Sequence, residues 1–374
     1  METSPLYQKV FGLLAGGAVG DAFGIRVEMM HYKDIEEQYG RVEHFDPIPW
    51  RKPSKQPPGE QWNPFGLQPQ NEQGYHPLGR WSHEVGAYTD DMRYRLMICQ
   101  AILRKQGPIN GVDLAEEWLN YRLMAEGAKE YLPTLTWPGP ERAYARILAS
   151  VPNLAAMATN QRFCQSGWDA PLGLMYPGEP DQAAGVGYSM AVAVAAALAP
   201  GATLDTVIEK VLKHADSLGK QASEFTGRLT RLLDIAAHCE DVFSLREPFY
   251  KHFLVSFPPW EGVFALEMVP CAIAMCAIAK GDARQAIIGA TNIGRDTDTI
   301  AAIAGELMGV LYGVQALPGE WVEKILRLNP SPDLPQMAAD LCALISTQAE
   351  RKHEVASSLL SQTHLPKSRP ISLE

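Results

Sequence analysis

Two groups of neighbouring carboxylates stand before apolar segments in distant parts of the chain. One is the run Thr-Asp-Asp at positions 89–91, and the other is Asp296 and Asp298 on either side of Thr297. Asp and Thr are favoured at helix N-termini, where the helix dipole also stabilises negative charge, so capping explains part of each group. If the two groups converge, their like charges can ionise together only beside a neutralising cation. Convergence therefore predicts a metal site.

The donor atoms in these groups restrict the metal. Carboxylates and hydroxyls without a nearby cluster of Cys or His favour Mg²⁺ or Mn²⁺ over Zn²⁺, and four carboxylates are enough for two ions. A third acidic group, Asp21 and Glu28, closes a segment at residues 12–20 whose glycines would let two helices cross closely. Glu28 is placed to orient water or to act as an acid or base.

The elements that position these groups are predicted to be helices. Apolar and small residues recur in the helical manner over residues 6–24, 95–104, 112–125, 183–199, 204–217, 225–238, 262–279 and 299–312. Alternating β-branched segments are scarce, and residues 39–45 are the best strand candidate. We therefore expect an all-α fold.

Length and composition favour a single large unit. The chain has 374 residues, 46% of them hydrophobic, and no evident linker, so one all-α domain is expected over residues 1–353. Eight prolines between Pro47 and Pro77 predict a long surface excursion at about residues 47–80. A second irregular segment covers residues 166–181, and residues 354–374 are expected to form a flexible tail.

Charge and cysteine usage narrow the partners and the compartment. The formal charge of −10, without a long run of Lys or Arg, argues against nucleic acid or anionic membrane as a partner. The six cysteines include no C-x-x-C pair and are expected to be reduced, buried thiols. The N-terminus lacks the basic stretch and long apolar core of a secretory signal, and the apolar runs further on are broken before about 18 residues. We expect a cytoplasmic protein, monomeric or a small homo-oligomer, that acts on small molecules or protein side chains.

Four segments follow one another in a familiar order over most of the chain. They are "GLLAGGAVGDAFGIRVE", "YTDD", "WDAPLGLMYPGEP" and "GRDTDTIAAIAGELMGVLYG". Together they resemble the ADP-ribosylglycohydrolase superfamily, the relatives of dinitrogenase reductase-activating glycohydrolase. The resemblance implies a compact multi-helix fold with two Mg²⁺ or Mn²⁺ ions in a central cleft. It also implies hydrolysis of an N- or O-glycosidic bond at the anomeric carbon of a ribose, usually that of ADP-ribose.

The resemblance assigns roles by position. The implied metal ligands are Thr89, Asp90 and Asp91 in the first group and Asp296, Asp298 and Thr299 in the second. The implied catalytic residues are Asp91, Asp296 and Glu28. Of these, Glu28 matches the family's acidic residue after the N-terminal glycine segment. Metal ions can fix ribose hydroxyls and lower the pKa of a bound water, while a carboxylate orients that water or protonates the leaving group.

Substrate contacts are expected from residues around the metal ligands. The expected substrate-binding residues are Asp21, Arg295, Trp168 and Tyr176. Aromatic rings can stack on a base, and Arg295 can bind a phosphate or narrow the pocket. Arg295 stands where the family usually has a second glycine, and Met92 and Arg93 replace a small hydroxyl residue and a polar group. These departures leave a nucleoside or another ribosyl compound open as the substrate.

Two other functional classes also stay open. Asp296-Thr297-Asp298 resembles the D-x-D of Mg²⁺-dependent haloacid-dehalogenase-type phosphatases, but that fold needs a parallel sheet, which the helical composition disfavours. A non-catalytic, ADP-ribose-binding member of the family would keep the fold without turnover. Retention of all six implied ligands argues against such decay. His83 and Glu84 are weaker pocket candidates.

Overall fold

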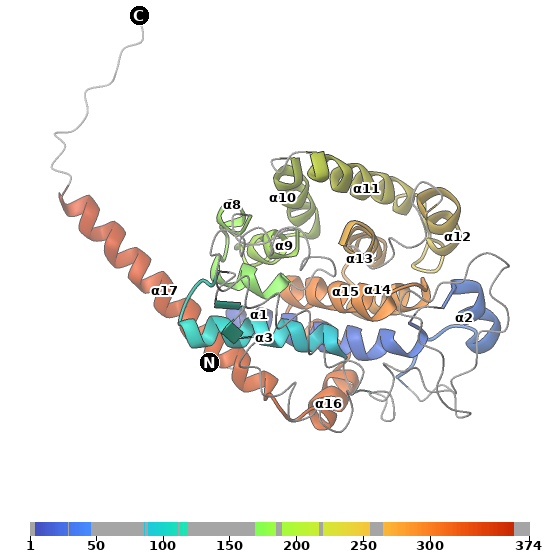
Figure 1. Cartoon of the computed structure of the whole chain (residues 1–374), viewed down its shortest axis with the longest axis horizontal. Helices are drawn as coiled ribbons and strands as arrows, with labels where there is room; N and C mark the ends of the chain where they lie inside the picture. Colours follow the sequence, from blue (N-terminus) through green and yellow to red (C-terminus); the bar gives the residue numbers. More distant parts are fainter. Residues whose placement is uncertain are drawn as a thin grey trace, which may run out of the picture.

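The structure of the chain is a computed structural model, which describes residues 4–28, 30–45, 86, 89–110, 113–114, 116–117, 169–184, 189–216, 220–254 and 265–362. All regular elements in these ranges are helical (Figure 1), so the expected all-α fold is confirmed for them. The longer helices are α1 (Pro5–Gly24), α2 (Tyr32–Tyr39), α3 (Asp90–Lys105), α9 (Ser189–Ala197), α10 (Leu204–Asp216), α11 (Lys220–Ala236), α13 (Ala265–Ala279), α14 (Ala283–Asn292), α15 (Thr297–Tyr312), α16 (Gly319–Leu328) and α17 (Leu334–Gln362). The short elements are η1 (Ile25–Val27), η4 (Ala170–Met175), α8 (Pro180–Ala183), α12 (Arg246–Pro248), η5 (Phe249–Phe253) and η8 (Val314–Ala316).

A seam of small residues joins α1 to α15 at the centre of the molecule. Every fourth residue of α1 meets a backbone group of α15 in reverse order, in the pairs Gly12–Gly309, Gly16–Gly305, Gly20–Ala301 and Gly24–Thr297. A Cβ atom at Gly16 would lie 2.0 Å from the carbonyl oxygen of Gly305. No side chain fits at such a distance, so the predicted use of these glycines for a close helix crossing is confirmed.

The antiparallel crossing has a consequence for the acidic residues. Because the C-terminal end of α1 meets the N-terminal end of α15, Asp21 and Glu28 arrive beside Asp296 and Asp298. Close backbone contact from Gly12 to Gly24 fixes the relative position of these two chain segments. The seam is therefore the scaffold of the candidate site.

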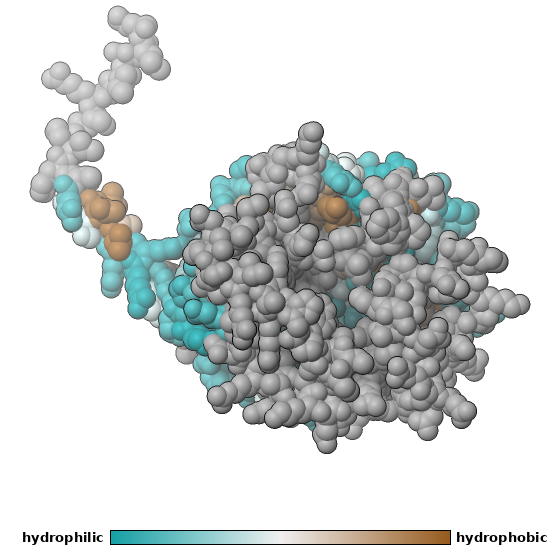
Figure 2. Space-filling model, in the orientation of Figure 1, coloured by the Kyte–Doolittle hydropathy of each residue, from teal (hydrophilic) through white to brown (hydrophobic). Residues whose placement is uncertain are grey.

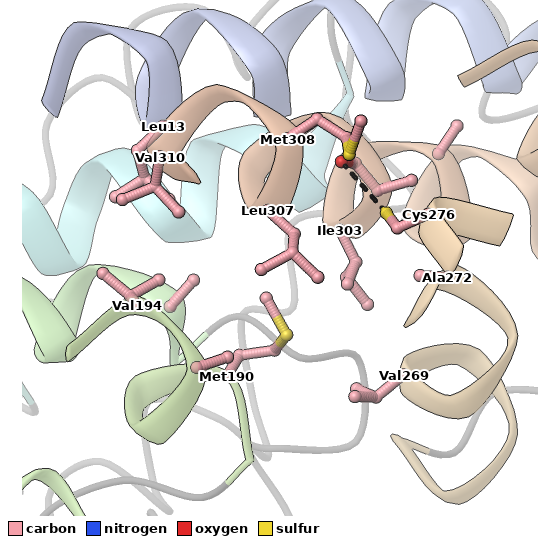
Figure 3. Packing of buried hydrophobic residues seen from close by; sticks show 14 of the residues in the cluster. Leu13, Met190, Val194, Val269, Ala272, Cys276, Ile303, Leu307, Met308 and Val310 are labelled. Atoms are coloured by element: carbon pink, nitrogen blue, oxygen red, sulfur yellow. Dashed lines mark hydrogen bonds between the residues drawn. The ribbon is translucent and has the colours of Figure 1, made fainter. Parts of the chain in front are cut away.

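The other helices surround this central pair. α14 and α13 pack against α15, and α11 packs in turn against α13 (Figure 1). α16 and α17 pack against α1, while α3 contacts both α1 and α15. The hydrophobic core continues through these layers. In Figure 3, Ile303 and Leu307 of α15 point toward Met190 of α9 and Val269 of α13.

The apolar helix α1 is a core element. The segment Pro5–Val27 is long and apolar enough by length and composition to cross a membrane, which corrects the expectation that the N-terminus has no long apolar core. However, 94% of its apolar window is buried inside the protein. The surrounding helices therefore cover this segment, and its composition reflects packing at the centre of the fold.

Most described cysteines match the expected buried thiols. Cys99, Cys271, Cys276 and Cys342 are buried, Cys239 is half-buried, and none of these five forms a disulfide. The Cys276 thiol lies 3.7 Å from the carbonyl oxygen of Ala304 in α15, as the dashed line in Figure 3 shows. Burial raises the pKa of the Cys99, Cys271 and Cys276 thiols, so they remain protonated and unreactive at neutral pH.

One local prediction was wrong. The strand expected at residues 39–45 is not formed, because Tyr39 ends α2 and the residues after Gly40 are irregular. Within the segment expected to be a flexible tail, residues 354–362 form the last turns of α17, which continues to Gln362. These outer turns extend away from the body and expose Val355, Leu359 and Leu360 (Figure 2). The proline-rich excursion at residues 47–80 lies outside the described residues.

Candidate metal centre

The two acidic groups singled out in the sequence meet in space. The hydroxyl of Thr299, in the first turn of α15, donates to Asp91 Oδ2 in the first turn of α3 at 2.8 Å. The hydroxyl of Thr89, the N-cap of α3, lies 3.4 Å from Asp298 Oδ2. Thr299 and Asp91 are 208 positions apart in the sequence, and Thr89 and Asp298 are 209 positions apart, yet their oxygen atoms share one buried cluster. This is the convergence on which the metal prediction depends.

One part of the cluster has the geometry of a cation site. Glu28, Asp296 and Asp298 each offer a carboxylate oxygen, and these oxygens all lie within 4.8 Å of one another. Asp296 and Asp298 are buried, and Glu28 is half-buried. It is the only such group of Asp, Glu, His or Cys among the residues that the structure describes. Three oxygen donors at this spacing suit a hard divalent cation.

The electrostatics of the cluster favour a bound cation. Burial, followed by the nearby charges of Glu28, Asp296 and Asp91, holds the pKa of Asp298 well above its usual range. Burial and the charge of Asp91 raise the pKa of Asp296 in the same way. Both pKa shifts have the same cause, which is the crowding of carboxylates away from water. A cation would relieve both the desolvation and the repulsion.

Local backbone contacts hold the two helix N-termini in place. The Asp21 carboxylate accepts hydrogen bonds from the backbone N–H groups of Thr89 and Met92, at 2.9 and 3.0 Å to Oδ2, so it ties α1 to the start of α3. The Thr297 hydroxyl donates to the carbonyl oxygen of Gly24 at 2.9 Å and ties α15 to the end of α1. Asp21 is fully buried and both its oxygens accept from the Thr89 N–H at the start of α3, while its expected contact with substrate stays a prediction.

Arg295 is held against another acidic residue. Its Nε and Nη2 atoms lie 2.6 and 3.0 Å from the two oxygens of Glu267 in α13, which is a bidentate ion pair. Its backbone N–H donates to the carbonyl oxygen of Met30. Its φ of 71° is in the left-handed region that favours glycine. The predicted contact with a substrate phosphate would have to compete with Glu267 or use the remaining guanidinium edge.

Sequence reasoning missed a buried ion pair behind Asp91. Arg95, one turn further along α3, places its Nε 2.8 Å from Oε1 of Glu306 in α15, and both side chains are buried. Arg95 also donates from Nη1 to the carbonyl oxygen of Asp91 at 3.0 Å. Part of the signal was present, because Glu306 is a charge within an apolar helical run.

The remaining predicted residues divide into two sets. Tyr176 is half-buried just after η4 and packs against the hydrophobic core, so its role toward a substrate stays a prediction. Trp168, His83, Glu84 and the side chain of Asp90 lie outside the described residues. The phosphatase alternative is contradicted in the described part of the chain, because Asp296-Thr297-Asp298 begins a helix and no strand precedes it.

Comparison with known proteins gives a consistent result. A family model described as ADP-ribosylglycohydrolase matches residues 2–351. The uncharacterised protein YegU of Escherichia coli K12 is 23% identical over 344 residues, which cover 83% of this chain and 89% of the relative. The ADP-ribosylhydrolase ARH3 of Gallus gallus is 26% identical over 308 residues, 68% of this chain and 78% of that protein. The ADP-ribosylarginine hydrolase Tri1 of Pseudomonas putida GB-1 is 55% identical over 40 residues, 11% of each chain.

Proposed function

Because the chain belongs to the ADP-ribosylglycohydrolase family, we propose that it is a metal-dependent hydrolase of the glycosidic bond at ribose C1 of an ADP-ribosylated substrate. The observation that carries the proposal is the meeting of Glu28, Asp296 and Asp298 beside Asp91 and Thr299. A purely structural protein would gain nothing from crowding these carboxylates away from water. Two of the relatives above are themselves named as ADP-ribosyl hydrolases.

The donor set fits Mg²⁺ or Mn²⁺. Asp296, Asp298 and Asp91 supply carboxylate oxygens and Thr89 and Thr299 supply hydroxyl oxygens, with no thiol or imidazole among these donors. When bound, a divalent ion would supply Lewis-acid polarisation and neutralise negative charge in the pocket. Two ions are expected, with Asp90 as a further ligand, as the family resemblance implies.

The protein side chains have separate tasks in the reaction. Glu28, at the half-buried edge of the cluster, would accept a proton from the attacking water in its ionised form and orient that water toward ribose C1. The Thr89 and Thr299 hydroxyls hold Asp298 and Asp91 in one orientation, so these oxygens do not reorganise during the reaction. Positive charge that builds on the ribose ring would lie near the carboxylates of this cluster, which would stabilise it.

The test is release of ADP-ribose or ribose from a panel of compounds, in Mg²⁺ or Mn²⁺ and again in EDTA. The panel contains ADP-ribosyl-arginine, ADP-ribosyl-serine, O-acetyl-ADP-ribose and simple nucleosides. We expect metal-dependent release from an ADP-ribosylated compound. Release from nucleosides alone would move the substrate class to simple ribosides. Binding of ADP-ribose without release from any compound would indicate a non-catalytic binding protein.

A pair of variants separates metal binding from the general effect of an Asp-to-Asn change near a helix start. Asp298→Asn should abolish turnover and weaken metal binding while leaving helical content unchanged, because an amide of the same size can still accept the Thr299 N–H but is a poor ligand for a hard cation. Asp282→Asn is the matched control, since Asp282 caps the exposed start of α14 through Gln285. The control should keep wild-type activity. Full metal-dependent activity of Asp298→Asn would refute the assigned centre.

A further inference from the structure

The buried guanidinium of Arg95 lies directly behind a candidate metal ligand. Its Nη1 donates to the backbone carbonyl oxygen of Asp91 at 3.0 Å and lies 3.4 Å from Asp91 Oδ1. The other carboxylate oxygen, Oδ2, accepts from the Thr299 hydroxyl. Both oxygens of Asp91 are therefore fixed by polar partners on the protein side. A carboxylate held at both oxygens has one orientation.

Glu306 fixes the guanidinium in turn. Its Oε1 lies 2.8 Å from Arg95 Nε, and the two side chains are only 1% and 2% exposed, so neither charge is compensated by water. Arg95 is on α3 and Glu306 is on α15, the same two helices that carry the two groups of candidate ligands. The ion pair thus locks together the helices whose first turns form the centre.

The fold leaves space for this pair at one glycine. Gly17 is outside the seam of every fourth residue that contacts the α15 backbone. A Cβ atom at Gly17 would lie 3.0 Å from Cγ and 3.3 Å from Oε1 of Glu306. The second glycine of the Gly16–Gly17 pair thus makes room for the Glu306 side chain. The ion pair is built into three helices, α1, α3 and α15.

Stability alone is a weak reason for such a pair. Burying two charges costs desolvation energy that their attraction often only offsets, and apolar residues of similar volume are commonly as stable or more so. Glu306 also interrupts a helical run, residues 299–312, that has no other charged residue. A role in orienting a neighbouring ligand accounts for the charges, because residues behind metal ligands set the orientation and affinity of a site.

We propose that Arg95 is a positioning residue of the metal centre, which holds the Asp91 carboxylate toward the bound cation while Glu306 anchors the guanidinium. The inference rests on the proposed function, because it requires that the centre binds a cation. The expected magnitude is that of other residues directly behind metal ligands, whose replacement lowers metal affinity roughly 10- to 100-fold.

The test is Mn²⁺ affinity, measured by titration calorimetry on the full chain at a temperature at which every variant is folded by circular dichroism. Arg95→Met/Glu306→Met removes both charges together, so neither is left buried without its partner. Arg228→Met/Glu224→Met is the matched control, since Arg228 is a buried arginine paired with Glu224 within α11. Arg95→Lys keeps the charge but removes the planar fork that reaches both acidic partners.

We expect the Arg95/Glu306 double variant to bind Mn²⁺ at least about 10-fold more weakly than wild type, and the Arg228/Glu224 control to bind it equally well. Equal Mn²⁺ affinity of the folded Arg95/Glu306 variant and the wild type would overturn the positioning role. If that variant does not fold, Arg95→Lys decides: weaker Mn²⁺ binding supports the role, and unchanged binding overturns it. A wild-type chain that binds no Mn²⁺ or Mg²⁺ would instead refute the metal centre of the proposed function.

Discussion

The close crossing of α1 and α15 predicts that one added methyl group will both destabilise the fold and damage the site. In Gly20→Ala the new Cβ would lie 1.9 Å from the carbonyl oxygen of Ala301 and 2.3 Å from its carbonyl carbon. Both atoms belong to the backbone of a buried helix, so no rotamer change can remove the clash. The two helices must move apart until the first distance is at least 3.0 Å.

The cost follows from the size of that movement. Overpacking of a well-packed core costs about 1–3 kcal/mol, and a clash between two helix backbones belongs at or above the upper limit. Alanine in place of glycine within a helix stabilises that helix by about 1 kcal/mol, which offsets part of this cost. We therefore expect Gly20→Ala to lose about 2 kcal/mol or more of unfolding free energy. Because Asp21 is the next residue, the movement should also weaken Mn²⁺ binding.

Gly227→Ala is the matched control for this substitution. Gly227 lies within helix α11, is exposed, and a Cβ atom added there would meet no atom within 4 Å. The same chemical change should there stabilise the protein by about 0.5–1 kcal/mol. The assay is urea unfolding followed by far-ultraviolet circular dichroism, with the midpoints compared at equal slopes. A Gly20→Ala variant as stable as Gly227→Ala would refute the close crossing.

Three further predictions concern other parts of the molecule. Burial and nearby negative charge raise the pKa of Asp21 and Asp296, so the folded chain without metal binds protons more tightly than the unfolded chain. Its melting temperature in EDTA should therefore rise as the pH falls from about 8 toward 5. Excess Mn²⁺ should raise the melting temperature most at high pH. A metal-free melting temperature that falls as the pH falls over this range would contradict the raised pKa of these carboxylates. Asn292→Ala should lower the free energy of unfolding by about 2–4 kcal/mol, measured in urea, because the Asn292 amide forms hydrogen bonds with both the N–H and the C=O of Val42. A loss under about 0.5 kcal/mol would be inconsistent with those hydrogen bonds. Under native conditions a thiol reagent should modify half-buried Cys239 before the four buried described cysteines, as read by mass spectrometry of peptides, and earlier labelling of a buried one would contradict the packing.

The sequence predicted the helices and the acidic residues that meet, for specific physical reasons. Apolar residues at helical spacing predicted α1 over residues 6–24 and α15 over residues 299–312, close to the observed Pro5–Gly24 and Thr297–Tyr312. The glycines along α1 indicated a close crossing. Acidic residues at the ends of buried helices indicated a shared site, because unpaired carboxylates are costly there.

Other features could not be predicted, because they depend on contacts between distant residues. Arg95 stands among other charges at the start of α3, Glu306 stands in an apolar part of α15, and only the packing of α3 on α15 reveals that they pair. Glu267 gives no local sign of its pairing with Arg295, 28 positions away. The segment after Tyr39 has strand-like residues, but it is fixed by the Asn292 amide and has no neighbouring strand in the described residues.

The most direct test of the metal centre is anomalous X-ray scattering from crystals grown with Mn²⁺, measured on both sides of the manganese absorption edge. We expect a peak bonded to carboxylate oxygens of Asp296 and Asp298, with Glu28 beside it, and loss of that peak in Asp298→Asn. A Mn²⁺ peak that lies only elsewhere, or no peak at saturating Mn²⁺, would contradict the account.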